Sequence, residues 1–226
     1  MKNQRWYVRC AAAVTAAVLF TGCGGGSVES GSRPAKAAKT LNTKQVMSVL
    51  PDAPAMTGWR NVETAVARRS TYPEQSETPP SMCPLALSDE TPCTDVRLDG
   101  RTAFLDPESK TDALFWVFTY HDEKAAAAAH KALWKNFYSH ILREDPTQVD
   151  LEDIGDERFA GRGDHPVFGR STMSLIRVGT ALLGINTSHS RTELPDKQLT
   201  ALAAMFAERA QQALDGKKPS AVTATG

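Results

Sequence analysis

The sequence predicts an α+β fold: a mostly antiparallel β-sheet packed by amphipathic helices, in a single domain. Residues 112–120 are apolar on both alternating faces, which is typical of a strand in the middle of a sheet. Strand candidates at 172–178 and 181–187 are separated only by Gly179-Thr180, which favours an antiparallel hairpin with glycine supplying a positive φ. Long amphipathic helices follow strands, but this hairpin replaces the repeated crossover of a parallel sheet.

Residues 1–22 are typical of a lipoprotein signal peptide. Basic residues and no acidic residue precede an apolar stretch at 10–20, which has the length of a signal-peptide core and is too short to span a membrane. The following Leu-Phe-Thr-Gly-Cys at 19–23 resembles a lipobox, although Phe20 stands where the pattern prefers leucine. We expect acylation of the Cys23 thiol and cleavage before it. The alternative is an ordinary signal peptide with a chance cysteine.

The expected domain organisation follows from this cleavage. Residues 23–40 would form the lipidated cysteine and a flexible tether, because they lack large apolar side chains. Residues 41–214 would form the folded domain, and 215–226 a disordered tail for the same reason. Two or three acyl chains suffice for stable anchoring, so we expect the protein at the extracytoplasmic face of the cell membrane.

The charge balance argues against one class of partner. The chain has 26 basic and 26 acidic residues, and without its signal peptide it would be slightly acidic. No basic patch stands out, so nucleic acid is not expected as a partner. Hydrophobic residues make up 41% of the sequence, which is enough for a real core.

The remaining cysteines suggest a disulfide. Cys10 leaves with the signal peptide, whereas Cys83 and Cys93 stay in a chain that reaches an oxidising compartment. We predict that these two form a bond closing a short loop. Two free buried thiols and a metal-binding pair are the alternatives, and the second is disfavoured because no histidine or third cysteine lies nearby.

Local patterns assign the elements that precede the central strand. Asn42 or Thr43 can cap a short helix that Pro51 stops near residue 50. The further assignments are a strand at 59–67, an exposed loop at 72–80, short helical turns near 81–87 and a modest strand at 96–105.

After the central strand, Asp122 can cap a helix to about residue 142, with an apolar stripe at helical spacing. The stripe contains His130, Leu133, Trp134, Phe137, Tyr138 and Ile141. Residues 161–166 are assigned to a loop because of their composition. Pro195 and Asp196 open a last amphipathic helix that ends near residue 214.

The five histidines give no metal-binding pattern, because none occur as His-Glu-x-x-His or at a spacing of four residues. His130 belongs to the apolar stripe and is expected in the core, while His121 and His140 mark element ends. His165 and His189 are assigned to loops near Asp164 and Glu193, where a site is conceivable.

Two short motifs are best explained without function. Arg162-Gly163-Asp164 spells an adhesion tripeptide, but a solvated turn is the better interpretation. An acidic group can attract a cation, but its spacing fits no calcium loop, so a solvated acidic turn is favoured. That group consists of Glu152, Asp153, Asp156 and Glu157.

The order of these features resembles one known family. A lipobox and polar tether, a short-spaced cysteine pair, Ile-Gly-Asp-Glu at 154–157, the segment 174–185 and a last amphipathic helix resemble the PknH-like extracellular sensor domain of actinobacterial serine/threonine kinases. The resemblance covers roughly residues 41–214. The kinase-linked domain has two disulfides, whereas this chain can form one. The resemblance implies a non-catalytic exported domain with a cleft for an unknown ligand, and it supplies no catalytic residues.

The sequence therefore predicts a membrane-anchored extracytoplasmic lipoprotein that acts as a ligand-binding or sensor domain, not an enzyme. No cofactor, metal or catalytic residue is expected. The partners expected are the membrane, through the lipid anchor, and an unknown small-molecule or envelope ligand; a protein partner stays open. The alternatives are an exported hydrolase using Asp164, His165 and His189, and a structural envelope protein with an exposed apolar patch.

Overall fold

The computed structural model describes residues 39–72, 82–83, 91–138, 141–142, 146–166, 169–189 and 193–223. The predicted signal peptide, Cys23, His140 and almost all of the predicted tether lie outside these ranges. So do most of the predicted loop at 72–80 and the helical turns at 81–87. No described helix is long and apolar enough to cross a membrane.

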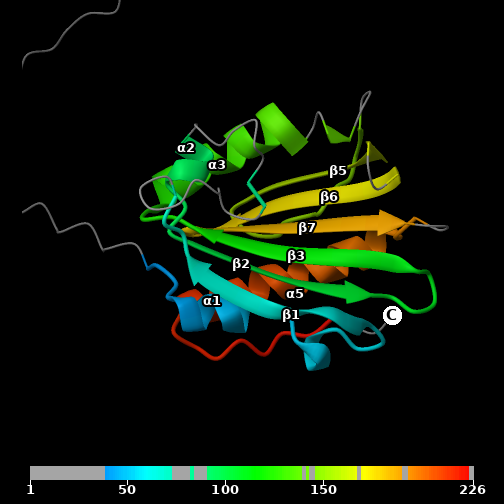
Figure 1. Ribbon diagram of the computed structural model, residues 1–226, viewed down its shortest axis with the longest axis horizontal. Coiled ribbons are helices and arrows are strands. Elements are labelled where there is room, and N and C mark those ends of the chain that lie inside the picture. The colour runs from blue at the N-terminus through cyan, green and yellow to red at the C-terminus, as the bar shows by residue number, and fades with distance from the viewer. Residues whose placement is uncertain are drawn as a thin grey trace, which may run out of the picture. The chain divides into compact units, whose positions relative to one another are not determined.

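Seven described strands form one antiparallel sheet in the order β1-β2-β3-β7-β6-β5-β4 (Figure 1). They are β1 (Arg60–Arg69), β2 (Leu98–Leu105), β3 (Thr111–Thr119), β4 (Thr147–Gln148), β5 (Glu157–His165), β6 (Gly169–Val178) and β7 (Ala181–His189). The predicted α+β class is confirmed, and the central position of β3 explains why both its faces are apolar.

Helices cover both faces of this sheet. They are α1 (Thr43–Val49), the 3-10 turn η1 (Ala53–Ala55), α2 (Thr91–Thr94), α3 (Glu123–Leu133), the π-helical turn η3 (Trp134–Tyr138) and α5 (Asp196–Leu214). Figure 1 shows α1 and α5 on one side and α2 and α3 on the other. The sequence did not predict α2 or the π turn.

The two faces of β3 contribute to two separate hydrophobic clusters. Phe115 and Val117 belong to the cluster beneath α1 and α5, where Phe115 meets Phe206 edge to face at 5.3 Å. Trp116 and Phe118 belong to the cluster beneath α3. Full burial of such a side chain contributes about 1.5–3 kcal/mol, so these clusters hold the layers together.

Two predicted element boundaries are confirmed in atomic detail. Asn42 caps α1, because its side chain accepts from the Gln45 N–H while the Gln45 side chain accepts from the Asn42 N–H. Asp122 caps α3 by accepting from the Ala125 N–H at 2.7 Å.

The predicted β6–β7 hairpin is also confirmed. Val178 pairs with Ala181, and Gly179 has a φ of +55°.

The predicted loop at 161–166 is wrong for all but its last residue, because β5 extends to His165. Glycine composition suggested a loop, but both glycines serve close packing. A Cβ at Gly161 would lie 3.3 Å from the Trp134 ring, and one at Gly163 would collide with the Leu142 carbonyl oxygen.

The chain after α5 also differs from the predicted disordered tail. The Thr223 N–H donates to the Ala55 carbonyl oxygen at 3.0 Å, and the Ser220 N–H donates to Gln212 Oε1 at 2.7 Å. Arg209 donates to the Ala221 carbonyl oxygen. Neighbouring polar groups therefore hold a segment that has few large apolar side chains of its own.

Candidate functional site

One part of the sheet lacks a helical cover among the described residues. On the side occupied by α3, the helix packs against β6 and β7, whereas α1 packs on β1 and β2 from the opposite side. Alternation along β2 and β3 therefore leaves one continuous surface, which we call the open face. Its members include Glu63, Val66, Arg68, Arg101, Ala103, Leu105 and Leu114, and the buried Asp99 on the same side pairs with Arg68.

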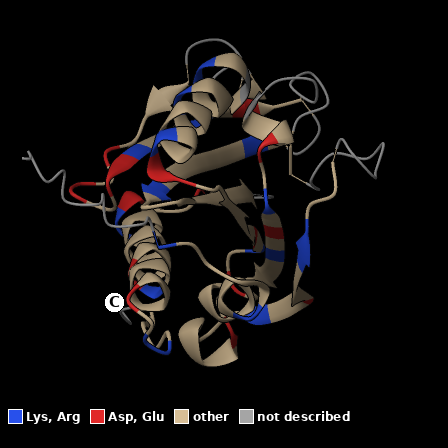
Figure 2. Cartoon of the chain, turned by 90° about the vertical axis from the view of Figure 1, so that its left-hand side faces the viewer, with Lys and Arg blue, Asp and Glu red and all other residues tan. Residues whose placement is uncertain are grey.

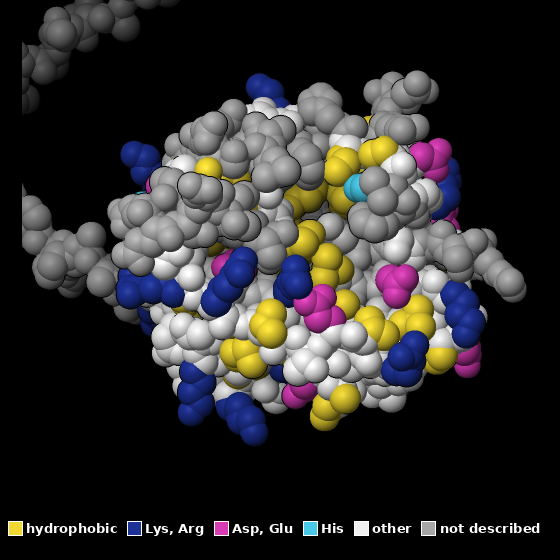
Figure 3. Space-filling view, in the orientation of Figure 1, with side chains coloured by type: hydrophobic (Ala, Val, Ile, Leu, Met, Phe, Trp, Pro, Cys, Tyr) yellow, Lys and Arg dark blue, Asp and Glu magenta, His cyan; other side chains and the backbone are white. Residues whose placement is uncertain are grey.

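The open face combines an apolar strip with charge. Ala103 lies opposite Leu114 in the β2–β3 register, and both are half-buried, as is Leu105. Val66 on the edge strand is 51% exposed. Figure 3 shows hydrophobic side chains gathered in a hollow on this side of the molecule, beside basic and acidic ones. Such a surface offers contact area to a ligand with an apolar part.

Two ion pairs border this strip. Arg101 Nε lies 2.6 Å from Glu63 Oε1, and Arg68 Nε contacts both carboxylate oxygens of Asp99 at 3.1 and 3.2 Å. The Asp99 side chain is almost completely buried, whereas Arg68 is largely exposed. The charges that border the strip are therefore neutralised in pairs.

The histidines that the sequence placed in loops lie instead at the ends of strands. His165 is the buried last residue of β5, and His189 is the last residue of β7, with its side chain outside the described part. Strand β6 runs between them, and Asp164 approaches Arg170 at 3.8 Å. The described contacts thus assign Asp164 to an ion pair with Arg170.

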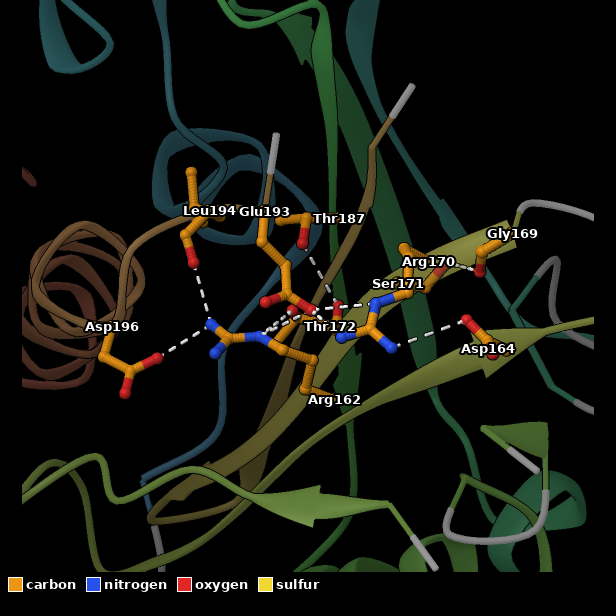
Figure 4. A network of polar contacts seen from close by, with 10 residues as sticks. All are labelled: Arg162, Asp164, Gly169, Arg170, Ser171, Thr172, Thr187, Glu193, Leu194 and Asp196. Atoms are coloured by element: carbon orange, nitrogen blue, oxygen red, sulfur yellow. Dashed lines mark hydrogen bonds and ion pairs between the residues drawn. The ribbon is translucent and has the colours of Figure 1, made fainter. Parts of the chain in front are cut away.

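Asp164 belongs to a network of charges that fastens the start of α5 (Figure 4). Arg162 donates to the Leu194 carbonyl oxygen at 2.8 Å and to Asp196 Oδ1 at 2.7 Å. Glu193 accepts from Arg170, at 2.7 Å from Nη2, and lies 3.7 Å from Arg162 Nε. Every charge in this network has a partner. Arg162 and Asp164 of the Arg-Gly-Asp tripeptide therefore have structural roles.

Carboxylates of the acidic turn also pair with arginines of the same chain. Asp153 pairs with Arg158 at 2.7 Å, and Arg177 contacts both Asp156 and Glu157 at 3.0 Å. Asp156 also accepts from the Gly179 N–H at 2.7 Å. Asp156 and Glu157 thereby tie the turn to the β6–β7 hairpin. Within the described ranges, no group of three potential metal ligands is close enough to hold an ion.

His130 lies in the core, as predicted, with 1% of its surface exposed. Its ring stacks on Phe159 at 4.9 Å, and Phe159 stacks on Trp134 at 5.3 Å. Desolvation by burial lowers the pKa of His130, partly offset by its hydrogen bond with Leu175 and the charge of Glu157. A neutral ring within an aromatic stack is a packing element. The exposed His121 contacts Asp122 at the start of α3.

The sulfur atoms of Cys83 and Cys93 lie at disulfide distance, with Cα atoms 5.9 Å apart. Both belong to the cluster beneath α3. Tyr120, in the same cluster, donates to the Pro92 carbonyl oxygen at 2.7 Å. Burial raises the pKa of this phenol well above its usual range. The cysteine segment is therefore attached to the α3 side of the sheet.

No protein-family profile and no curated protein matches the chain. Among solved structures, the chain is similar to the extracellular domain of PknH from Mycobacterium tuberculosis. The TM-score is 0.49 and the sequence identity 6%, over 80% of this chain and 100% of that one. This similarity is too low to show membership of a family.

Proposed function

We propose that the chain is a membrane-anchored extracytoplasmic lipoprotein whose folded domain binds a ligand without transforming it. The observation that carries the binding part is the open face. It is an extended strand surface with half-buried Ala103, Leu105 and Leu114, bordered by two ion pairs. The lipobox ending at Cys23 supports the anchoring part.

The chemistry of the open face favours a small molecule with an apolar part. Covering half-buried apolar side chains contributes roughly 25 cal/mol per Å² removed from water. The guanidinium of Arg101, whose side chain is 39% exposed, can orient a polar end of the same molecule. The open face offers contact area and orientation, and neither requires a nucleophile or a cofactor.

A substitution that fills the apolar strip of the open face tests the proposed ligand binding. Native mass spectrometry of protein purified from its own envelope should show a retained small molecule. The Ala103→Trp variant places an indole in the strip and should lose that molecule. Met47→Trp is the matched control, because Met47 is 40% exposed on α1, on the other side of the sheet. Equal retention by both folded variants would refute binding at the open face.

A separate experiment tests the anchoring part. Labelled palmitate should enter the wild-type chain and not the Cys23→Ser variant, which should leave the membrane fraction or stay unprocessed. Cys10→Ser is the control, because Cys10 precedes the predicted cleavage point and should not affect labelling. Label that persists in Cys23→Ser would reject the lipobox while leaving ligand binding untouched.

A further inference from the structure

A pocket lies at the end of the sheet where β1 ends and β2 begins. It has a volume of about 360 Å³ and shares no residue with the open face. Figure 2 looks onto this end of the molecule and shows basic segments on both strands. Its polar lining consists of Thr40, Asn42, Thr43, Arg69, Arg97 and Thr119.

The two arginines of this pocket differ from most others. Arg68, Arg101, Arg158, Arg162, Arg170 and Arg177 each pair with a carboxylate, and Arg209 binds backbone carbonyls. Within the described ranges, neither Arg69 nor Arg97 has an ion pair or a side-chain hydrogen bond, and no acidic residue lines the pocket. Two positive charges therefore share one concave surface without a counter-charge.

The sheet fixes the backbone positions of these arginines. Arg69 lies opposite Leu98 at the last pair of the β1–β2 ladder. The Ser70 N–H donates to the Arg97 carbonyl oxygen at 2.9 Å, and the Arg97 N–H donates to the Thr119 carbonyl oxygen at 2.8 Å. Thr119 is 1% exposed and forms the buried wall. Because Arg69 and Arg97 line the same pocket, they attract an anion into it more strongly than separate surface arginines would.

From this geometry we infer that the pocket binds a phosphate or phosphate-ester anion. The planar guanidinium group presents paired N–H donors that match two oxygens of a phosphate. Threonine hydroxyls at Thr40 and Thr43 can donate to the remaining oxygens. The site is separate from the open face, and it would stand if the open face bound nothing.

The anion can come from a lipid headgroup or from a free phosphate compound. Thr40 lines the pocket, so the pocket lies where the chain enters the domain. Under the proposed lipid anchoring, the sixteen residues from 24 to 39 span at most about 55 Å when fully extended, which leaves the pocket within reach of the bilayer surface. Both sources present the same phosphate oxygens, and the test below separates them.

The test uses the compact unit of residues 37–226, which contains every described element, so that acyl chains play no part. Inorganic phosphate is titrated by calorimetry or NMR, and vesicles of anionic phosphatidylglycerol or neutral phosphatidylcholine are compared by co-sedimentation. Wild-type protein should bind phosphate saturably, and the Arg69→Ala/Arg97→Ala double variant should bind at least about tenfold more weakly, because two charge-assisted contacts are lost.

Arg60→Ala is the matched control. Arg60 lies at the other end of β1, has no ion pair within the described ranges and does not line the pocket. Loss of anionic-vesicle binding in the double variant alone would assign the headgroup as the source. Phosphate binding without vesicle binding would assign a free phosphate compound. No saturable binding, or equal weakening by Arg60→Ala, would overturn the inference.

Discussion

The Nδ1 atom of His130 lies 3.7 Å from Glu157 Oε2, inside the core and without a hydrogen-bond partner among the described residues. The other ring nitrogen lies 3.1 Å from the Leu175 carbonyl oxygen, which can only accept, so Nε2 carries the proton of the neutral ring. Protonating Nδ1 would create a buried cation that Glu157 favours and that the positive charges of Arg177 and Lys131 disfavour.

This arrangement predicts that stability falls as the solution becomes mildly acidic. Burial holds the pKa of His130 below its ordinary value, so the unfolded chain binds the proton first. Neutral His130 makes its full contribution to the free energy of unfolding above about pH 6.5, the pKa of histidine in the unfolded chain. This contribution is lost as the pH falls below that value. Urea midpoints between about pH 7.5 and pH 5 should decrease more in wild type than in His130→Gln, which keeps a donor for the Leu175 carbonyl.

His121→Gln is the control for this titration, because His121 is an exposed histidine at the start of α3. It should show the wild-type pH dependence. If His130→Gln and wild type lost stability in parallel, the acid sensitivity would have another origin.

The cysteine pair predicts that reduction measurably lowers the free energy of unfolding. If Cys83 and Cys93 are bonded, as we expect, the bond closes a short loop, because the two cysteines are separated by 10 positions in the sequence. The chain-entropy estimate for such a loop is about 3 kcal/mol. The Cys83→Ala/Cys93→Ala variant should unfold at correspondingly lower denaturant concentration. Intact mass analysis that found two free thiols in exported wild-type protein would contradict the bond.

Gly184 allows the Trp116 indole to lie flat on β7. A Cβ at this position would collide with ring atoms Cε2, Cζ2 and Nε1 of Trp116. The ring also stacks on Tyr138 at 5.9 Å, so a shift of the indole would disturb that contact. Gly184→Ala should cost at least about 1–3 kcal/mol, measured by chemical denaturation.

Gly169→Asn provides the contrast. Gly169 has a φ of +69° and open space around its Cα, and asparagine tolerates that conformation. This variant should stay close to wild type. Equal destabilisation by both substitutions would mean that backbone freedom, and not the Trp116 contact, matters at Gly184.

Arg209 fastens the end of α1 and the C-terminal segment to α5. Its guanidinium donates to the carbonyl oxygens of Ser48, Val49 and Leu50 and to that of Ala221. Arg209→Met should therefore destabilise the domain by roughly 2–4 kcal/mol, because buried carbonyls lose their donors. Backbone amides of residues 217–223 should then exchange hydrogen faster than in wild type.

Arg60→Met serves as the control, since Arg60 makes no such contacts within the described ranges. If hydrogen exchange in the C-terminal segment stayed slow in Arg209→Met, the contacts with Ala55 and Gln212 would suffice to hold it.

Local patterns predicted most of the helices and strands. The predictions that failed concern segments whose structure depends on long-range contacts. The caps at Asn42 and Asp122, the hairpin at Gly179 and the two-faced β3 depend on neighbours within a few residues. Strand β5 was mistaken for a loop because the packing that requires Gly163 comes from Leu142, which is distant in sequence. The C-terminal segment was misjudged because its partners belong to α5 and η1.

The sequence by itself determined the element pattern, the capping residues, the core position of His130 and the candidate lipidation site, because each depends on side-chain chemistry at short range. Only the tertiary structure decided which sheet surface stays open, that Arg162 and Glu193 are used in fastening α5, and that Arg69 and Arg97 share a pocket. Strand order and register set those neighbours, and a residue's own chemistry does not reveal which distant side chains will face it.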